Sequence, residues 1–206
     1  MTARKKARGT GGCYCDNAQR SKGNLISCSN QELKAATESD TQRFRTRVSM
    51  NLTIRPYQPS DLEVLKRITS EAFSGASLDQ LVEEHFGILH GHDWRWRKTR
   101  HIDEDVAANA GGIFVAEDEG EILGYITTTV DRTIGKGRIP NIAIVPEARG
   151  KGLGRQLIQH ALHYFRREGM AYATIETMEG NEVGKHLYPD CGFTEVARQI
   201  HFAMKL

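Results

Sequence analysis

The sequence predicts a mixed α/β domain, with a mostly antiparallel sheet flanked by helices, in residues 50–206. Segments with strand and helix periodicity follow one another in the order β, α, α, β, β, β, α, β, α, β, β. A hairpin signal at Glu119-Gly120 joins two strand-like segments, and a strand–helix–strand crossover comes late in the chain. The 206 residues are enough for one domain of ordinary size and some surplus.

Residues 1–49 lie outside the predicted domain, and we expect them to be a disordered basic tail. They are rich in Ser, Thr, Gly, Asn, Lys and Arg, show no hydrophobic period, and offer too little apolar area to offset ordering. They hold ten Lys/Arg and four Asp/Glu, a net charge of +6, which leaves −4 for residues 50–206. A basic run at residues 4–8 could touch nucleic acid, but a solvated tail is the simpler interpretation. Met50 directly precedes the first patterned segment and is an alternative start.

The first half of the domain predicts one strand and two helices. Residues 52–57 alternate in polarity as a short strand, and Ser60-Asp61-Leu62-Glu63 has the pattern of a capping box that opens a helix. A second helix is expected around Leu78–Phe86. The stretch Trp94–Asn109 is polar and aromatic, and we expect it to be an irregular insertion that Gly111-Gly112 ends.

The second half predicts the rest of the sheet and two further helices. Strands are expected at residues 113–117, 121–131, 138–145 and 171–177, and one or two final strands at 195–204. Residues 150–167 give the strongest helical signal in the chain, with one apolar face. That face carries Leu153, Leu157, Ile158, Ala161, Leu162 and Phe165. A short helix is expected at 182–188.

Composition narrows the classes of function. No segment reaches the roughly 20 apolar residues that span a membrane, and no apolar stretch follows the N-terminal basic residues, so we expect a cytoplasmic protein with no membrane partner. The four cysteines (Cys13, Cys15, Cys28, Cys191) lack paired zinc-ligand spacing, so no metal is expected. Nucleic acid is not an expected partner, because the tail lacks interleaved aromatic residues and the domain is acidic. A homodimer stays an open alternative.

One loop has the features of an anion site. Arg149, Gly150, Lys151, Gly152, Leu153, Gly154 and Arg155 lead from a buried strand through a turn ended by Pro146 into the amphipathic helix. Alternate glycines remove Cβ atoms where a ligand approaches the backbone, and the amides of the first helical turn have no partner within the helix. The loop lacks the Gly-Lys-Ser/Thr of a P-loop, and Arg155 stands where a dinucleotide loop has its third glycine. A diphosphate fits this site better than a neutral ligand.

These residues carry a resemblance to a known family. Arg-Gly-Lys-Gly-Leu-Gly after Ile-Val-Pro-Glu resembles the acyl-CoA pyrophosphate loop of the GNAT superfamily of N-acetyltransferases. Asn181, Leu187-Tyr188 and Gly192-Phe193 resemble the second signature of that family. The resemblance covers about three quarters of the chain and implies a sheet that splays between its fourth and fifth strands, here 138–145 and 171–177.

The resemblance also implies how acetyl-CoA, the expected cosubstrate, is held. The pantetheine arm would lie in the gap between the two splayed strands. The stretch Ile142, Ala143 and Ile144 would pair with the arm by its backbone and supply an amide to the thioester oxygen. The pyrophosphate would lie on the loop from Arg149 to Arg155.

Two side chains are candidates for catalysis, and one is a candidate for cofactor binding. Tyr188 matches the family's general acid, although a packed core tyrosine is the alternative. Asn181 could bind the cofactor arm, cap the helix that follows, or do both. Many relatives carry a Glu directly before the position of Ile142, but Asn141 stands there in this chain. Glu176 on the partner strand is the leading substitute for the base, with a solvated carboxylate as the alternative.

The acceptor is expected to be a primary amine of a small molecule or a peptide. Its site should come from the first two helices and residues 73–109, where Trp94 and Trp96 could wall an amine pocket or simply cover the core. The alternative function is a module of the same fold that binds acyl-CoA without turnover, which the missing carboxylate favours.

Overall fold

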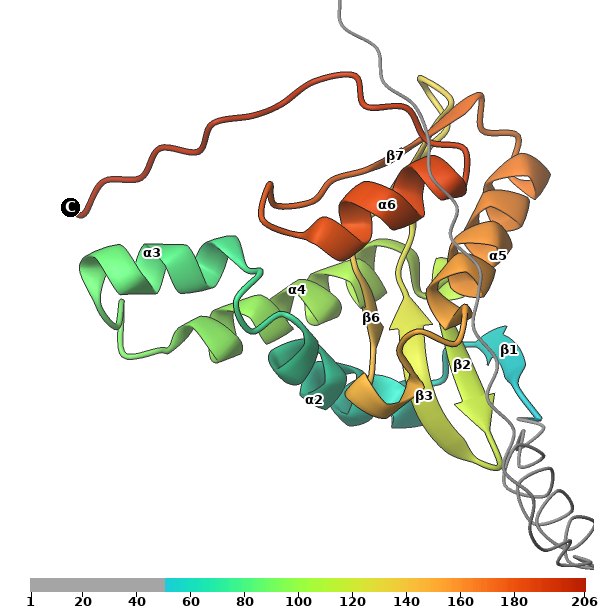
Figure 1. Cartoon of the computed structure of the whole chain (residues 1–206), viewed down its shortest axis with the longest axis horizontal. Helices are drawn as coiled ribbons and strands as arrows, with labels where there is room; N and C mark the ends of the chain where they lie inside the picture. The colour runs from blue at the N-terminus through green and yellow to red at the C-terminus, as the bar shows by residue number, and fades with distance from the viewer. Residues whose placement is uncertain (1–50) are drawn as a thin grey trace, which may run out of the picture. The chain divides into compact units, whose positions relative to one another are not determined.

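The computed structural model describes residues 51–206, and the predicted tail, residues 1–49, lies outside the described residues. Five α-helices, seven strands and three short 3-10 turns make up the described part (Figure 1). The predicted α/β class with a mostly antiparallel sheet is confirmed. No helix in residues 51–206 is long and apolar enough to cross a membrane.

The first sheet has the strand order β1-β2-β3-β6 and is antiparallel throughout. Its strands are β1 (Thr53–Pro56), β2 (Phe114–Asp118), β3 (Glu121–Ile126) and β6 (Ile142–Ile144). The predicted hairpin joins β2 to β3, and Glu119 and Gly120 both have positive φ, of 50° and 88°. Two positive φ values are what a two-residue turn between twisted strands requires.

The second sheet has the order β4-β5-β7. Strand β4 (Thr129–Asp131) pairs antiparallel with β5 (Lys136–Ile139), and β5 pairs parallel with β7 (Tyr172–Ile175). The predicted strand 121–131 is therefore divided into β3 and β4, and the predicted strand 138–145 into β5 and β6. The two breaks lie beside each other, since the Thr127 amide after β3 bonds to the Asn141 carbonyl before β6 at 2.9 Å. Pro140 has no amide and so cannot continue the strand ladder from β5 into β6.

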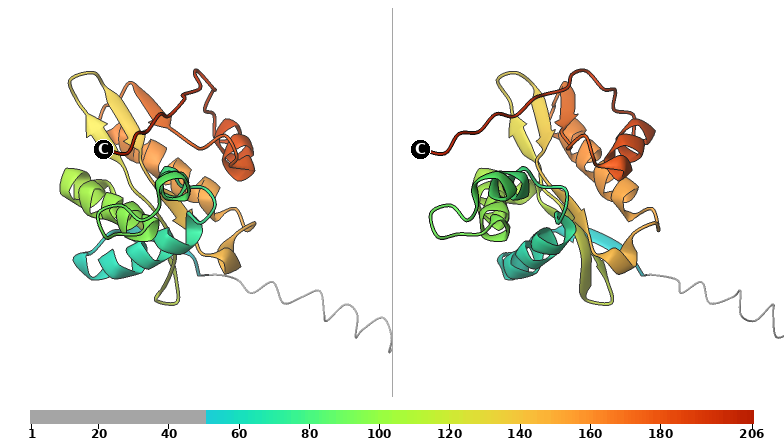
Figure 2. Two further views of the ribbon diagram at one scale, coloured as in Figure 1. Left: turned by 90° about the vertical axis from the view of Figure 1, so that its left-hand side faces the viewer. Right: turned by 60° about the vertical axis from the view of Figure 1, so that its left-hand side comes forward.

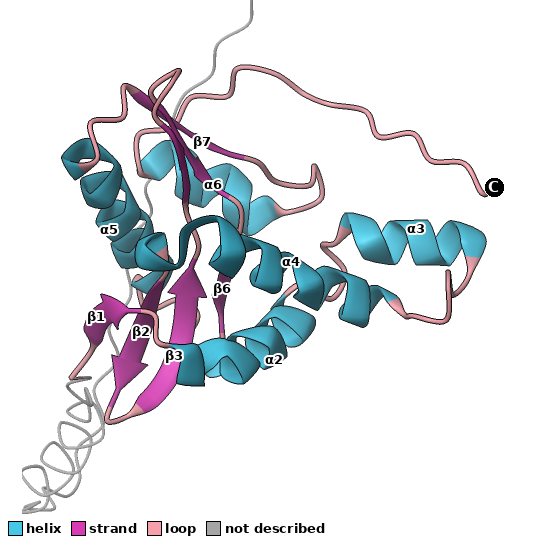
Figure 3. Ribbon diagram, turned by 180° about the vertical axis from the view of Figure 1, so that it is seen from behind, coloured by secondary structure: helices cyan, strands magenta, loops and turns pink. Residues whose placement is uncertain are grey.

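Helices cover both faces of the first sheet. Helix α5 (Leu153–Arg167) packs on one face, and α2 (Leu62–Ala72) with α4 (Trp94–Asn109) packs on the other (Figures 2 and 3). Strand β2 serves both layers, because Phe114 and Ala116 point to α5 while Val115 points to α2 and α4. The predicted apolar face of α5 is confirmed, since Leu153, Leu157, Ile158, Ala161 and Phe165 are all buried.

Two N-terminal details of the prediction are wrong. The capping box lies two residues earlier than predicted, at Gln58 and Asp61, because a 3-10 turn (Pro59–Asp61) precedes α2. Residues 94–109 are a regular helix, α4, and not an irregular insertion. Asp93 caps this helix by accepting the Trp96 amide at 2.8 Å. The sequence shows no apolar period here, because two of the four buried residues of the helix, Lys98 and Asp105, are charged. The other two are Trp94 and Ile102.

The predicted C-terminal strands are also wrong. After α6 (Glu182–Asp190), residues 194–206 form no strand in the structure. The alternation that predicts a strand is present, but its apolar residues Val196, Ile200 and Phe202 are exposed. Figure 1 shows this end of the chain running away from the sheet. A strand needs a partner, and the described chain supplies none to this segment.

Candidate active site

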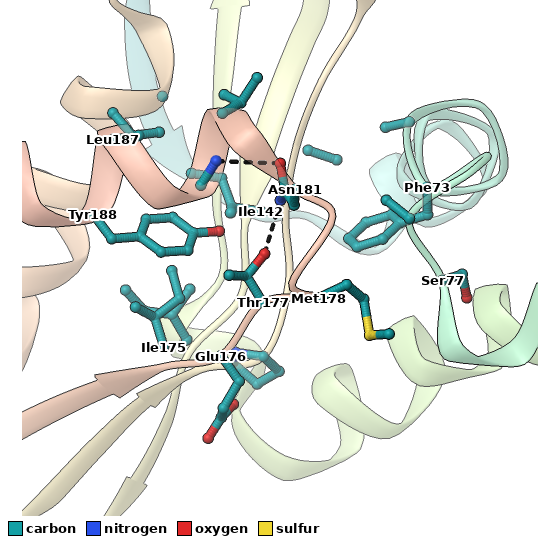
Figure 4. A pocket seen from close by; sticks show the side chains of 18 of the residues that line it. Phe73, Ser77, Ile142, Ile175, Glu176, Thr177, Met178, Asn181, Leu187 and Tyr188 are labelled. Carbon is teal, nitrogen blue, oxygen red and sulfur yellow. Dashed lines mark hydrogen bonds between the residues drawn. The ribbon is translucent and has the colours of Figure 1, made fainter. Parts of the chain in front are cut away.

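A cavity opens where the two sheets diverge. The parallel pairing of β5 with β7 ends at Ile139 and Ile175, and β6 then pairs only with β3. A cavity of about 450 Å³ lies in this opening. Its walls come from the end of α2, α3 (Leu78–Phe86), α4, β6, the segment after β7 and α6. Figure 4 shows the cavity from close by. The predicted splay of the sheet is confirmed.

Strand β6 presents backbone groups to the cavity. Ala143 is opposite Tyr125 in the antiparallel register. On either side of it, the Asn141 carbonyl accepts from the Thr127 amide just after β3, and the Val145 amide donates to the Leu123 carbonyl of β3. Because the direction of backbone groups alternates along a strand, the amides and carbonyls of Ile142 and Ile144 point away from β3, to the side of the cavity. The Ile144 carbonyl accepts from the Arg149 Nε at 3.1 Å. This edge is suited to pairing with an extended ligand.

The loop before α5 leaves its amides uncovered. Gly152 is the N-cap residue of α5, with φ of 80°, and no side chain caps the helix. Gly150 also has positive φ, of 73°. A Cβ at either glycine would meet no protein atom within 4 Å. The space in front of this helix end is thus open to an anion, which the free amides and the helix dipole attract.

The third glycine has a different purpose. A Cβ at Gly154 would lie 3.1 Å from Leu187 and 3.3 Å from Ile144, so this glycine lets α5 pack closely on α6 and β6. The cationic side chains also differ in their surroundings. Arg155 binds Asp190 at the end of α6 at 2.8 Å, while Lys151 is exposed. Direct contacts from these side chains to phosphate stay predictions.

Tyr188 lies on α6 with its ring against the core and lines the cavity. Its hydroxyl points toward Thr177 and the opening (Figure 4). Burial raises the pKa of Tyr188 above its ordinary value. The phenol therefore keeps its proton at neutral pH, as a proton donor must. Its role as general acid stays a prediction.

Asn181 is held by bonds within the chain. Its Oδ1 accepts the Gly184 amide at 3.2 Å and caps α6, and its Nδ2 donates to the Thr177 Oγ1 at 2.8 Å. Of the two roles that the sequence leaves open, the cap is the one whose bonds the structure contains. A contact with the cofactor arm stays a prediction.

Glu176 lies at the rim of the cavity and is paired. Its Oε2 is 3.0 Å from the Arg138 Nε, and half of its side chain is exposed. Figure 4 shows its carboxylate directed away from Tyr188. The neighbouring cation and the direction of the carboxylate count against Glu176 as the base, and that role stays a prediction.

The end of the cavity where an acceptor is expected differs from the prediction in one respect. Phe73, Ser77 and Met178 line it, and they come from the first helical region and the segment after β7. The two tryptophans do not. Trp94 is buried in the core, and Trp96 is partly exposed and stacks on His92 at 3.5 Å between ring centroids. Trp96 faces away from the cavity, because it is two residues from Lys98 along α4 and so points to another side of the helix. Trp94 shares the buried face with Lys98 but lies one turn before it, outside the cavity lining.

A buried polar network beneath the cavity is not expected from the sequence. Lys98 donates to the Asn141 Oδ1 at 2.7 Å, and the Asn141 Nδ2 donates to Asp105 at 2.7 Å. The Thr127 hydroxyl also donates to Asp105, at 2.7 Å. The spacing of Lys98, Ile102 and Asp105 on one helical face is the signal that could have revealed it, once residues 94–109 were taken as a helix.

The described residues contain no other obvious centre of chemistry. No group of three or more His, Cys, Asp or Glu side chains in residues 51–206 could hold a metal ion. Burial raises the pKa of the Cys191 thiol, which disfavours the thiolate and so a role as nucleophile.

Comparison with protein families identifies relatives of this architecture. The model of the acetyltransferase (GNAT) family matches residues 75–193. A mycothiol acetyltransferase of Propionibacterium freudenreichii is 26% identical over 175 residues, which are 82% of this chain and 56% of that protein. The corresponding protein of Tsukamurella paurometabola is 27% identical over 168 residues, 74% of this chain and 51% of that protein. The chain thus spans about half the length of the curated relatives that it matches.

Solved structures share the fold. The PaiA N-acetyltransferase of Thermoplasma acidophilum, in complex with coenzyme A, has a TM-score of 0.55 at 18% identity, covering 68% of this chain and 88% of that one. The ribosomal-protein-S18-alanine N-acetyltransferase of Escherichia coli has a TM-score of 0.52 at 21% identity, covering 71% and 79%. At this level of identity the likeness concerns the fold.

Proposed function

The chain belongs to the acetyltransferase (GNAT) family, and from this premise we propose that it transfers an acetyl group from acetyl-CoA directly to a primary amine of a small molecule or a peptide. The observation that carries the proposal is the cavity itself. It joins an open strand edge, an uncapped helix N-terminus and a protonated tyrosine in one place. The proposal includes a cytoplasmic setting, where acetyl-CoA is supplied.

The residues present fit coenzyme A. The amides at the start of α5 and the open space at Gly150 and Gly152 suit the diphosphate. The free edge of β6 suits the pantetheine arm, which carries amide groups that can pair with the amides and carbonyls of Ile142 and Ile144. When bound, acetyl-CoA supplies an activated thioester.

The chain's own groups then have three tasks. An amide of β6 donates to the thioester oxygen and stabilises the negative charge that forms during attack, which is worth about 2.7 to 4 kcal/mol for a well-placed donor. Tyr188 gives its proton to the departing thiolate. The acceptor amine approaches from the end lined by Phe73, Ser77 and Met178.

The proposed acceptor is a primary amine. The named relatives are mycothiol acetyltransferases, of which this chain matches about half. Asn141 stands directly before β6, where a carboxylate base is common in the family, and this favours the second candidate, a module that binds acyl-CoA without turnover.

Release of free thiol distinguishes the two functions. The protein is incubated with acetyl-CoA and a panel of primary amines, and the thiol is measured with a chromogenic disulfide. We expect thiol release that depends on the amine and saturates with both substrates. Saturable binding of acetyl-CoA without release by any amine would favour the binding module.

A substitution at Gly152 tests the place of the diphosphate. Gly152→Asp puts a carboxylate in front of the α5 amides, so we expect the Kd for acetyl-CoA, measured by calorimetry, to rise about tenfold or more. Any side chain strains the backbone at this left-handed position, with φ of 80°, so the Tm of the variant is measured as well. Gly152→Asn is the matched control, because it has the same shape and no charge, and its Kd should rise less. Unchanged affinity in Gly152→Asp would contradict the loop assignment.

A further inference from the structure

The acceptor amine has to lose a proton before it can attack, and Glu176 is poorly placed to take it. A free alkylamine has a pKa near 10.4 and arrives as an ammonium ion at neutral pH. The carboxylate of Glu176 is paired with Arg138 and points away from Tyr188. Asn141, which occupies the position of a carboxylate in many relatives, cannot accept a proton. Another basic group on the cavity wall is better placed for this step.

Resting on the proposed function, we propose that Lys98 is the base: its neutral amino group accepts the proton of the acceptor ammonium at the cavity wall. Lys98 lies on the buried face of α4 and lines the cavity together with Phe73, Ser77 and Tyr188. Only 8% of the residue is exposed. Its Nζ lies 4.0 Å from the centroid of the Phe73 ring, and Phe73 also lines the cavity. The face of this ring favours the charged form of Lys98, whereas burial of the amino group favours the neutral form.

The partner of Lys98 permits the neutral form. The Nζ donates to the Asn141 Oδ1, which is a neutral amide oxygen. A neutral lysine amine can make this bond with one N–H and still keep its lone pair free. A carboxylate at the same place would hold the lysine as an ammonium ion. Asn141 in place of an acid therefore allows Lys98 to be neutral, as a base must be.

Asp105 fixes the amide that Lys98 meets. The Asn141 Nδ2 and the Thr127 hydroxyl both donate to the Asp105 Oδ2. These bonds set the orientation of the Asn141 amide, with its oxygen toward Lys98. The amide thus lies between the carboxylate of Asp105 and the amino group of Lys98. Asp105 and Asn141 are thus positioning residues in this scheme.

The charges around Lys98 act in both directions. Burial lowers the pKa of Lys98 below its ordinary value, while Asp79 from α3 and Asp105 from α4 oppose this change and Arg138 from β5 adds to it. His101 from α4 also lines the cavity and lies 3.7 Å from Asp79. Tyr125 from β3 is fully buried, and its pKa is raised so that it stays neutral. A lysine in a desolvated site is a known type of base near neutral pH.

The protons balance in this scheme. Lys98 takes one proton from the acceptor ammonium, and the nitrogen lone pair then attacks the thioester carbon. The C–N bond forms, the C–S bond breaks, and the thiolate takes the Tyr188 proton. The acetylated nitrogen returns its surplus proton to the Tyr188 oxygen, and Lys98 releases its proton to solvent. The sum is one amide, one thiol and one released proton.

The test compares Lys98→Met, Lys98→Arg and wild type, with Lys66→Met on α2 as the control outside the cavity. We expect kcat/KM for an alkylamine at pH 7 to fall about 100-fold in both Lys98 variants. Lys98→Arg is the informative variant, because arginine can still donate a hydrogen bond to Asn141 but is always protonated and so does not accept a proton. The Kd for acetyl-CoA and the Tm are measured for each variant.

Two further readouts separate a base from a structural residue. The acid limb of kcat/KM in wild type should lie below pH 10 and move up to the amine's own pKa in Lys98→Met. A weakly basic arylamine arrives neutral, so the deficit of Lys98→Met should shrink with it. Lys98→Arg as active as wild type, or a wild type without an acid limb below the pKa of the amine, would overturn the assignment. Absence of amine-dependent thiol release in wild type would instead refute the proposed function.

Discussion

At the residue scale, burial gives the Tyr188 hydroxyl the properties of a proton donor. Its pKa is raised, so the hydroxyl is protonated below its ordinary pKa near 10 and for some distance above it. A thiolate formed in the cavity is a stronger base than bulk conditions suggest, because the same desolvation acts on it. The neighbouring Asn181 caps α6 and, as a carboxamide, does not release a proton. Tyr188 is therefore the better candidate of the two for proton donation.

Replacing Tyr188 should affect turnover more than binding. Tyr188→Phe keeps the ring contacts with the core and removes the proton, so we expect kcat to fall about 100-fold while the Kd for acetyl-CoA changes little. In wild type, kcat should hold to about pH 10 and fall only above it, because the acid is lost above its raised pKa. Steady-state kinetics across pH measure both effects. Tyr172→Phe, at an exposed position of β7, is the control. A Tyr188→Phe enzyme with the wild-type kcat would exclude the residue from the reaction.

At the scale of elements, one ionic cluster ties β1 to the start of α2 and to β2. Arg55 on β1 binds Asp61 at 2.8 Å and Glu117 on β2 at 2.7 Å. Asp61 also accepts the Gln58 amide at 2.8 Å and so closes the capping box before α2. The bond from Arg55 holds the pKa of Asp61 below its ordinary value.

This cluster should make stability depend on pH. Because the folded pKa of Asp61 is lowered, its contribution is present above the unfolded pKa near 3.9 and is lost as pH falls through the folded value. Asp61→Asn should therefore lower the free energy of unfolding by about 1 to 3 kcal/mol at pH 7 and by less at pH 3. Urea denaturation at both pH values measures the difference. Asp103→Asn, on a more exposed pair with Lys66, is the control and should cost less. An equal loss at both pH values would contradict the ionic origin.

The elements that the sequence predicts well are those whose cause is local. The hairpin at Glu119-Gly120 and the apolar face of α5 depend on residues within a few positions of one another, and both are confirmed. Helix α4 is not predicted, because its buried face includes Lys98 and Asp105, whose partners Asn141 and Thr127 lie far along the chain. The division of the long predicted strands near Pro140 also involves a long-range contact, the bond between Thr127 and Asn141.

The candidate site shows the same division. The loop at Gly150 and Gly152 and the edge of β6 follow from motifs, whereas the pairing of Glu176 with Arg138 and of Arg155 with Asp190 requires side chains to meet across elements.

In residues 194–206 a clear local pattern gives a wrong prediction. Their alternation is a good strand pattern, but no described strand lies beside them, and a pattern without a partner does not define a sheet.

At the scale of the whole molecule, the cavity depends on the assembly of both sheets with their helices. Its lining residues run from Ala72 to Tyr188 and come from α2, α3, α4, β5, β6, α5 and α6. Strand β1 is not part of the lining, but it completes the edge of the first sheet by pairing with β2 from Thr53 to Pro56. Its removal would expose the backbone groups of β2 and take away Arg55.

The basic segment of residues 1–49 should therefore be dispensable for catalysis. We expect a chain that begins at residue 50 to keep kcat and KM for acetyl-CoA within about twofold of the full chain, because differences below roughly 0.5 kcal/mol are typical of changes away from a site. The net charge of +6 in the removed segment is the reason to measure both chains at low and high salt, since an electrostatic effect on the binding of the anionic acetyl-CoA would disappear at high salt.

A chain that begins at residue 58 is the matched comparison. It lacks β1 and the Arg55 contacts to Asp61 and Glu117, so we expect a markedly lower Tm and little activity, although no cavity residue is removed. The pair of truncations places the functional N-terminal boundary between residues 50 and 58. A loss of activity already at residue 50, at both salt concentrations and with an unchanged Tm, would show that the first 49 residues take part in the reaction.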